Sequence, residues 1–250
     1  MIYDIQKASL LKRASAFLLD IILLVVLACG FGVTVSNITN FDSHFKTLDD
    51  IRVRYETEYG VSFDDMSGEL TEEEKAVYDA IDKALQEDQE YIRCFNMIIS
   101  LSMVIVSMGL LLSYLTLEFV VPLILKNGQT LGKKVFGIAL MRSDGVKVSA
   151  FALFVRALLG KYTLETMIPV LILIMMFMGT IGIVGPLVLL GILVIEIVLM
   201  IKSKTNSTIH DYLAVTVAVD LSSQMIFETP EDMLEYKKQV QAEMANKAPY

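Results

Sequence analysis

The sequence predicts an all-α membrane protein with four transmembrane helices, both termini in the cytoplasm, a small cytoplasmic β-hairpin and an extracytoplasmic helical insertion. Three observations predict this class. The 250 residues are 54% hydrophobic with a mean hydropathy of +0.58, which is too apolar for a soluble domain of this length. Four apolar segments approach the roughly 20 helical residues that cross a bilayer. Acidic and basic residues also lie in separate parts of the chain.

The four predicted spans are residues 14–35, 95–125, 166–183 and 184–201. The last two are separated only by a few glycines and Pro186, so they form either a tight helical hairpin or one long kinked helix. VLAC before Gly30 faintly resembles a lipoprotein cleavage box. Asp20 inside the apolar core and the three later spans count against a cleaved signal peptide.

Charge predicts the orientation, because positively charged loops near span ends stay in the cytoplasm. Seven basic residues and one acid lie between residues 126 and 162, and further basic residues flank the first and last spans: Lys7, Lys12, Arg13, Lys202 and Lys204. Only an even number of crossings after residue 162 keeps the last pair inside. The charge pattern therefore favours two short helices over one.

The segment 37–94 holds sixteen acidic and six basic residues, which places it outside. Thr71 and Glu74 form a capping box at a helix start. Apolar residues recur at helical spacing after it, and neither Gly nor Pro occurs before Gly109. We expect this helix to run without a break into the second span as an external stalk.

The basic loop predicts β-structure. Residues 135–142 and 146–149 are short β-prone stretches on either side of Ser143, Asp144 and Gly145, a turn signal that supports a hairpin. The β-prone stretch 213–219 is expected to close a small sheet at the membrane face. In the tail, Thr229 and Pro230 predict the start of a cytoplasmic helix over residues 229–246.

Arg13 starts the first helix, Asp20 lies within it and Asp211 follows the last span, accompanied by GQTLGKKVFGI, the SDG turn, FVRALL and IHDYLAVTV. This arrangement resembles the RDD family of integral membrane proteins, over about residues 4–220 apart from the external segment. That segment looks long for the family, and the tail beyond residue 220 is an addition. The resemblance implies a membrane domain that moves ligands or ions, with sodium/proton antiport proposed for some members.

Asp20 needs compensation, since a carboxylate near the middle of a bilayer costs about 2.5–3.5 kcal/mol. Arg13 precedes it by seven residues, roughly 10 Å along the helix axis, so the two do not form a direct ion pair. Arg156, which lies among apolar residues, is the candidate partner for one carboxylate. Asp211 at the membrane face is the candidate partner for Arg13.

Two further acids occupy spans, Glu118 one turn before Pro122 and Glu196 in the fourth span. Pro122 frees the carbonyl of Glu118, an oxygen ligand suited to a hard cation. Asp20, Glu118 and Glu196 are therefore predicted to form a site where protonation and cation binding compete. The alternative is that Asp20 only fixes helix packing through buried contacts.

The sequence predicts no cofactor, no metal site and no catalytic residues. His44 and His210 are the only histidines and lie in no recognisable cluster, so the chain is not expected to be an enzyme. Lys133 and Lys134 are expected at anionic lipid headgroups on the cytoplasmic face of the bilayer. A small cation is the expected ligand and nucleic acid is not a partner, while the oligomeric state, a homo-oligomer included, stays open.

The predicted organisation is a first transmembrane helix with the Arg/Asp motif (1–36), the acidic insertion (37–94), a second transmembrane helix (95–125), a basic cytoplasmic loop with a β-hairpin (126–163), a transmembrane hairpin (164–201) and a cytoplasmic C-terminal segment (202–250). Such a multi-pass protein belongs in a cell membrane, and the acidic outside fits a bacterial plasma membrane. The leading function is transport or antiport of a small ligand or cation. The alternative is a scaffold or accessory subunit that transports nothing.

Overall fold

The computed structural model describes residues 5–63, 71–203 and 205–247, so that Lys204 lies outside the described residues. The chain forms two units, one of Met1–Ala28 with Leu110–Tyr250 and the other of Cys29–Gly109. Four helices within the described ranges are long and apolar enough to cross a membrane: Leu10–Ile38, Gln89–Leu125, Ala150–Phe177 and Val184–Lys202. The predicted number of spans is therefore confirmed.

The third span begins earlier than predicted. It consists of α7 (Ala150–Val155), the π-helix η3 (Arg156–Met167) and α8 (Ile168–Phe177), whereas hydropathy placed its start at residue 166. Charged side chains in η3 lower the hydropathy of this half of the helix, although two of them, Arg156 and Lys161, are buried. The polar half of the span was therefore mistaken for part of a loop.

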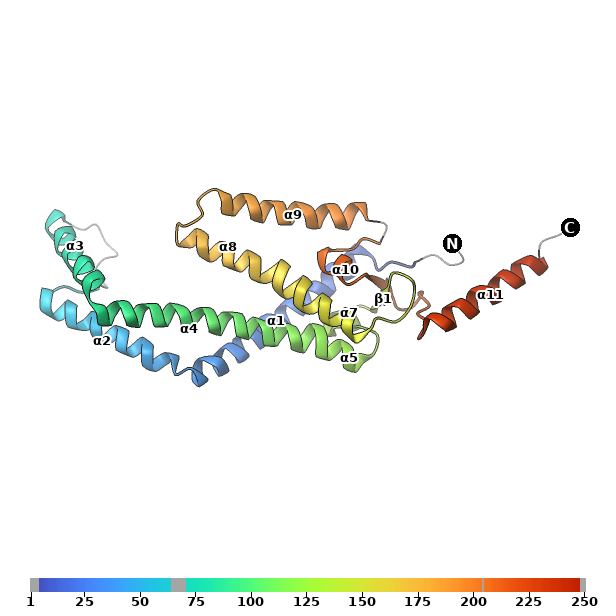
Figure 1. Ribbon diagram of the computed structural model, residues 1–250, viewed down its shortest axis with the longest axis horizontal. Helices are drawn as coiled ribbons and strands as arrows, with labels where there is room; N and C mark the ends of the chain where they lie inside the picture. Colours follow the sequence, from blue (N-terminus) through green and yellow to red (C-terminus); the bar gives the residue numbers. More distant parts are fainter. Residues whose placement is uncertain (1–4, 64–70, 204, 248–250) are drawn as a thin grey trace. The chain divides into compact units, whose positions relative to one another are not determined.

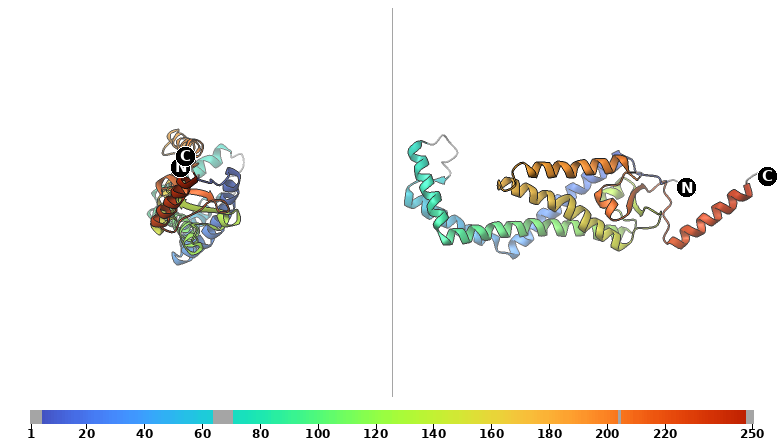
Figure 2. Two further views of the ribbon diagram at one scale, coloured as in Figure 1. Left: turned by 90° about the vertical axis from the view of Figure 1, so that its right-hand side faces the viewer. Right: turned by 45° about the horizontal axis from the view of Figure 1, so that its top comes forward.

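The last two apolar segments form separate helices. α8 ends at Phe177 and α9 (Val184–Lys202) follows, and Figures 1 and 2 show the two side by side. The turn between them has positive φ angles at Gly179 (69°) and Gly182 (47°), a conformation that glycine adopts readily. The structure therefore confirms the predicted helical hairpin and excludes the alternative of one long kinked helix.

Two π-helical segments interrupt the α-helices of the first unit. The second span consists of α4 (Gln89–Tyr114), η2 (Leu115–Val120) and α5 (Val121–Leu125), and η3 lies in the third. The N–H of Val121 bonds the carbonyl of Thr116, and Ile168 bonds Thr163, each five residues back. Because five-residue bonds widen the turn, a π-helix brings onto one face side chains that an ordinary helix separates.

The sheet has two strands, and its pairing differs from the predicted hairpin. β1 (Ile138–Arg142) pairs antiparallel with β2 (Thr216–Asp220), whereas the segment after the SDG turn contributes single bridges, Lys147 with Met141 and Val146 with Phe227. β1 is covered by apolar side chains on both faces, so its main partner is the equally apolar β2. The prediction that the C-terminal stretch closes the sheet is confirmed.

The second unit contains two helices with a core of their own. α2 (Phe41–Tyr59), which the sequence did not predict, packs against α3 (Glu72–Glu87). The buried residues between them are Ile51, Tyr78, Ile81 and Leu85. The predicted capping box at Thr71 is present, and its Oγ1 accepts from the Glu74 N–H across 3.3 Å.

The prediction of one continuous helix running into the second span is wrong. Asp88 is extended, with a ψ angle of 110°, and separates α3 from α4. Its carboxylate accepts hydrogen bonds from the backbone N–H groups of Glu90 (2.8 Å) and Tyr91 (3.2 Å). An aspartate cap thus starts a new helix without glycine or proline.

Three further helices complete the first unit. α6 (Leu131–Val135) follows the second span and α10 (Ile209–Leu213) follows the fourth, while α11 (Pro230–Lys247) ends the chain. The predicted start of α11 is confirmed, since Thr229 Oγ1 accepts from the Asp232 N–H. α10 packs on η3, and this contact brings the functional residues of the two segments together.

Candidate functional site

Asp20 is 7% exposed and is held by the loop and helix that follow the second span. The Thr130 hydroxyl and the Gly132 N–H (2.8 Å) both donate to its carboxylate. Thr130 also caps α6 by accepting from the Lys133 N–H. A Cβ at position 132 would lie 2.8 Å from Asp20 Cγ and closer still to the Ala16 carbonyl, so only glycine lets α6 approach α1 this closely.

Lys133 connects two membrane carboxylates. Its Nζ lies 4.0 Å from Asp20 Oδ2 and 3.9 Å from Glu118 Oε2. Burial lowers the pKa of Lys133 to about 7, although the neighbouring carboxylates of Glu118 and Asp20 oppose this shift. The expectation that Lys133 contacts lipid headgroups is wrong, since it is buried, whereas Lys134 is exposed.

Glu118 is surrounded by three cationic side chains. Arg156 Nη1 donates to its carboxylate across 3.2 Å, Lys161 forms a second ion pair with it, and Lys133 is the third cation. The Glu118 residue is 4% exposed. A buried carboxylate with several cationic partners is well compensated, which favours its ionised state.

Asp211 pairs with two arginines from different spans. Its Oδ1 accepts from Arg156 Nε across 3.0 Å and its Oδ2 accepts from Arg13 Nη2 across 3.2 Å, so both predicted pairings of these arginines are confirmed. The hydroxyls of Thr208 (3.1 Å) and Thr216 (3.2 Å) donate to the same carboxylate. Burial would raise the pKa of Asp211, but Arg156 and Arg13 hold it well below its usual range.

We call these seven charged residues the ion-pair network: Arg13, Asp20, Glu118, Lys133, Arg156, Lys161 and Asp211. Among the described residues, no buried side-chain nitrogen or oxygen lacks a hydrogen-bond partner. The network links the first, second and third spans to α6 and α10. It therefore compensates charges that would be costly if unpaired in a bilayer.

A second group of charged residues lies beside the network, and we call Glu165, Glu196 and His210 the Glu–His cluster. The Nδ1 of His210 lies 2.7 Å and 2.8 Å from the two carboxylate oxygens of Glu165. Glu196 accepts from the Ile209 N–H across 3.3 Å. One ligand atom from each cluster member lies within 4.8 Å of the others, so the expectation that His210 belongs to no cluster is wrong.

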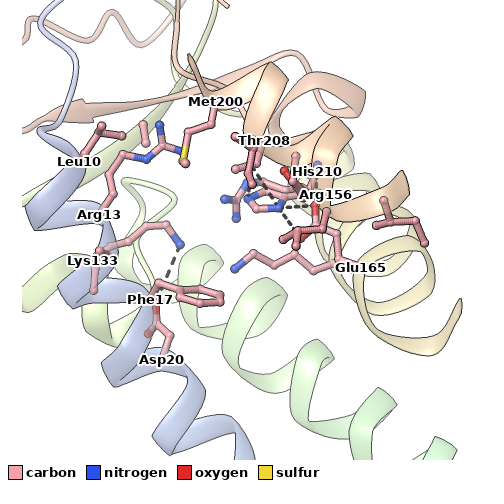
Figure 3. A pocket seen from close by; sticks show the side chains of 18 of the residues that line it. Leu10, Arg13, Phe17, Asp20, Lys133, Arg156, Glu165, Met200, Thr208 and His210 are labelled. Carbon is pink, nitrogen blue, oxygen red and sulfur yellow. Dashed lines mark hydrogen bonds and ion pairs between the residues drawn. The ribbon is translucent and has the colours of Figure 1, made fainter. Parts of the chain in front are cut away.

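The network and the cluster border one cavity of about 670 Å³. Figure 3 shows Arg13 and Asp20 on one side of it, and Arg156, Glu165 and His210 on the opposite side. Apolar side chains such as Leu193 of α9 form much of the remaining wall. Carboxylates of the first, third and fourth spans thus share a cavity.

The predicted site residues fall into two places. The structure brings Arg13, Asp20, Glu118, Arg156 and Asp211 into the network, whereas Glu196 joins the cluster. Several residues that complete these sites were not predicted from the sequence: Thr130, Lys161, Glu165 and Thr208. The sequence did contain a sign of Lys161 and Glu165, because two opposite charges four residues apart beside an apolar segment are typical of neighbours on one helix face.

The sequence matches the RDD family over residues 7–215, a range that contains every residue of the network and the cluster. No curated protein and no solved structure matches the chain. Because the match covers most of the chain, this membrane protein belongs to the RDD family.

Proposed function

We propose that the chain exchanges a small cation for protons across a cell membrane. The observation that carries this proposal is the shared cavity, in which Asp20, Glu165 and Glu196 from three spans border one space of about 670 Å³. Ionisable residues within spans commonly mark ion pathways and proton relays. A carboxylate that binds a proton loses affinity for a cation, and competition of this kind couples the two ions.

The carboxylates have different surroundings, and these suggest different roles. Glu118 and Asp211 are almost fully buried among cationic partners, so we assign them to holding the helices together. Asp20, Glu165 and Glu196 border the cavity and can meet an incoming ion. Asp20 remains the first residue to test, because its partners are a hydroxyl, an N–H group and one lysine at 4.0 Å.

In the orientation we propose, both termini and the two-stranded sheet face the cytoplasm and the acidic segment 37–94 lies outside. The basic residues near the span ends support this through their cytoplasmic preference. The acidic exterior fits a bacterial plasma membrane. Lys134, which is exposed, remains suited to anionic lipid headgroups.

Flux in proteoliposomes tests the proposal. The protein is compared with Asp20→Asn, a nearly isosteric change that removes the charge, and with Asp42→Asn on exposed α2 as the matched control. We expect sodium-driven proton flux in the wild type and in Asp42→Asn, and its loss in Asp20→Asn at equal amounts of folded protein. No flux in the wild type, for sodium, potassium or a divalent cation, contradicts exchange.

The second candidate is a scaffold or accessory subunit that transports nothing. It is favoured by the separate core of the second unit, around Ile81, which is fully buried. A pair of helices with its own core, between the first two spans in the sequence, suits partner binding. This function predicts that Asp20→Asn lowers the melting temperature and the amount of protein, with no flux in either form.

A further inference from the structure

We infer that the Glu–His cluster is a binding site for a divalent transition-metal ion of the Zn²⁺, Co²⁺ or Mn²⁺ class. Its three residues come from three elements, Glu165 from η3, Glu196 from α9 and His210 from α10. Their ligand atoms lie within 4.8 Å of one another, close enough to surround one ion. This inference deepens the proposed function. Metal binding itself does not depend on transport, but the idea that the metal is the transported ion rests on the proposed function.

The donor set distinguishes this class of metal from alkali ions. One imidazole with two carboxylates is typical of zinc and related metals, whereas hard cations prefer oxygen ligands alone. Metal sites with three protein ligands keep a further position for water or an exchangeable group. All three side chains border the cavity, so an exchangeable ligand can reach that position.

Hydrogen bonds around His210 direct its Nδ1 toward the carboxylates. The Nε2 lies 2.9 Å from Thr208 Oγ1, and that hydroxyl donates to Asp211 across 3.1 Å. Because that hydroxyl can donate to the aspartate and accept from the imidazole, the ring can carry its hydrogen on Nε2, and this tautomer leaves the Nδ1 lone pair available to a metal. Nδ1 lies 2.7 Å from a Glu165 oxygen, so it donates to that carboxylate when it carries the hydrogen, and a metal ion that binds both groups would replace this hydrogen.

This chain of bonds is the kind that orients a metal-binding histidine. Ligating histidines generally give their other ring hydrogen to an oxygen that is itself fixed in place. Close packing also fixes the position of the His210 backbone, since a Cβ at Gly160 would lie 2.7 Å from the His210 Cα. The backbone N–H groups of Ile209 and His210 in turn bond the Glu196 and Glu165 carboxylates.

The nearby cationic side chains are engaged elsewhere. Arg156 bonds Glu118 and Asp211, and Lys161 pairs with Glu118. One oxygen of Glu165 lies within 4.8 Å of one oxygen of Glu196, and two carboxylates this close repel each other when both are ionised. A divalent ion placed among the three ligands removes this repulsion.

The test is metal binding at equilibrium, with no transport step. The full chain is purified in detergent with a tag free of histidine, stripped with a chelator, and titrated with Co²⁺ by visible absorption and with Zn²⁺ by calorimetry in sodium chloride. We expect one ion per chain. Glu196→Gln and Glu165→Gln should each lower the affinity by about 10- to 100-fold or more.

Matched controls are available in the second unit. Glu73→Gln, on an exposed position of α3, and His44→Ala remove the same residue types far along the chain and should bind metal as the wild type does. The inference is overturned if the wild type binds no metal, or if both cluster variants bind with unchanged affinity. If the cluster variants do not fold, the melting temperatures of the wild type and His44→Ala decide, because Zn²⁺ should raise both.

Failure of this inference and failure of transport are distinguishable. Sodium–proton flux without metal binding overturns the metal site and leaves exchange intact. Metal binding that depends on Glu196, without flux of any ion, supports the site and overturns transport. Metal binding together with Zn²⁺-driven proton flux supports both.

Discussion

Arg156 and Asp211 are separated by 55 residues, yet the arginine Nε lies 3.0 Å from the aspartate Oδ1 and both side chains are at most 3% exposed. This contact joins the third span to α10 at the centre of the ion-pair network. Breaking a buried pair from one side leaves an uncompensated charge, which costs about 3–5 kcal/mol. The pair therefore determines the stability of the first unit more than the exposed ion pairs do.

A double-mutant cycle tests this contact. We expect Arg156→Met and Asp211→Asn each to lower the melting temperature in detergent strongly, with a coupling free energy on the order of 0.5–3 kcal/mol. The control cycle uses Arg142 and Asp144, which lie 2.7 Å apart but are 45% and 37% exposed. That coupling should be at most about 1 kcal/mol. Equal coupling in the two cycles would contradict the central role of Arg156.

A methyl group at position 132 should disturb the contact between α6 and α1. Gly132→Ala places a Cβ 2.8 Å from Asp20 Cγ, and we expect a loss of about 1–3 kcal/mol in the free energy of unfolding. Gly191→Ala in α9 is the control, because nothing lies within 4 Å of its Cβ. It should be neutral or stabilising by about 0.5–1 kcal/mol. Thermal unfolding in detergent measures both, and similar losses would count against close packing at Gly132.

Lys133 should make stability depend on pH. Burial lowers its pKa to about 7 from the ordinary value of 10.5. Between these pH values the unfolded chain holds a proton that the folded chain releases, so stability rises with pH by up to about 1.4 kcal/mol per unit. Below about pH 7 Lys133 is protonated in both the folded and the unfolded chain, and the full cost of burying its charge lowers the stability.

The comparison with Lys133→Gln isolates this contribution from other titrating groups. The melting temperature of the wild type minus that of the variant should increase by several degrees from about pH 7 to pH 9. Lys134→Gln, the exposed neighbour, should show a difference that does not change with pH. Parallel curves for the wild type and Lys133→Gln would mean that Lys133 titrates as an ordinary lysine.

The capping box gives a prediction confined to the second unit. Thr71→Ala removes the hydroxyl that accepts from the Glu74 N–H and should cost about 1 kcal/mol of local stability. Hydrogen exchange should accelerate in the first turn of α3 while flux stays unchanged. Thr57→Ala, whose hydroxyl bonds Val53 within α2, is the control. Faster exchange throughout the first unit would contradict the division of the chain into two units.

The sequence predicted the spans and most of the network because these follow from hydropathy and from the position of charges. Arg13, Asp20 and Arg156 were recognisable as charges in apolar surroundings that need partners. Lys161 and Glu165 were not, since the segment around them resembled a loop. In the structure the Lys161 side chain meets Glu118 of η2 and the Glu165 side chain meets His210 of α10, and these contacts form only when the helices pack.

The Glu–His cluster was unpredictable for a different reason. Glu165, Glu196 and His210 have no fixed spacing along the chain, and only the packing of three helical elements brings them together. A local contact had a similar effect at Asp88. This one residue ends α3, although the composition of the segment allowed the helix to continue. In both cases specific side-chain contacts determined the structure, and neither residue spacing nor composition predicts those contacts.

The contacts of the first helix also define an order of events during synthesis. Arg13 pairs with Asp211 across 198 residues, and Asp20 bonds Thr130 across 110. At about 5–20 residues per second, a ribosome takes roughly 10–40 s to translate the stretch between Arg13 and Asp211. The nascent first helix therefore enters the bilayer with both charges unmatched, and the insertion machinery must shelter or tolerate the aspartate until residues 130–132 have emerged and the arginine until Asp211 has emerged.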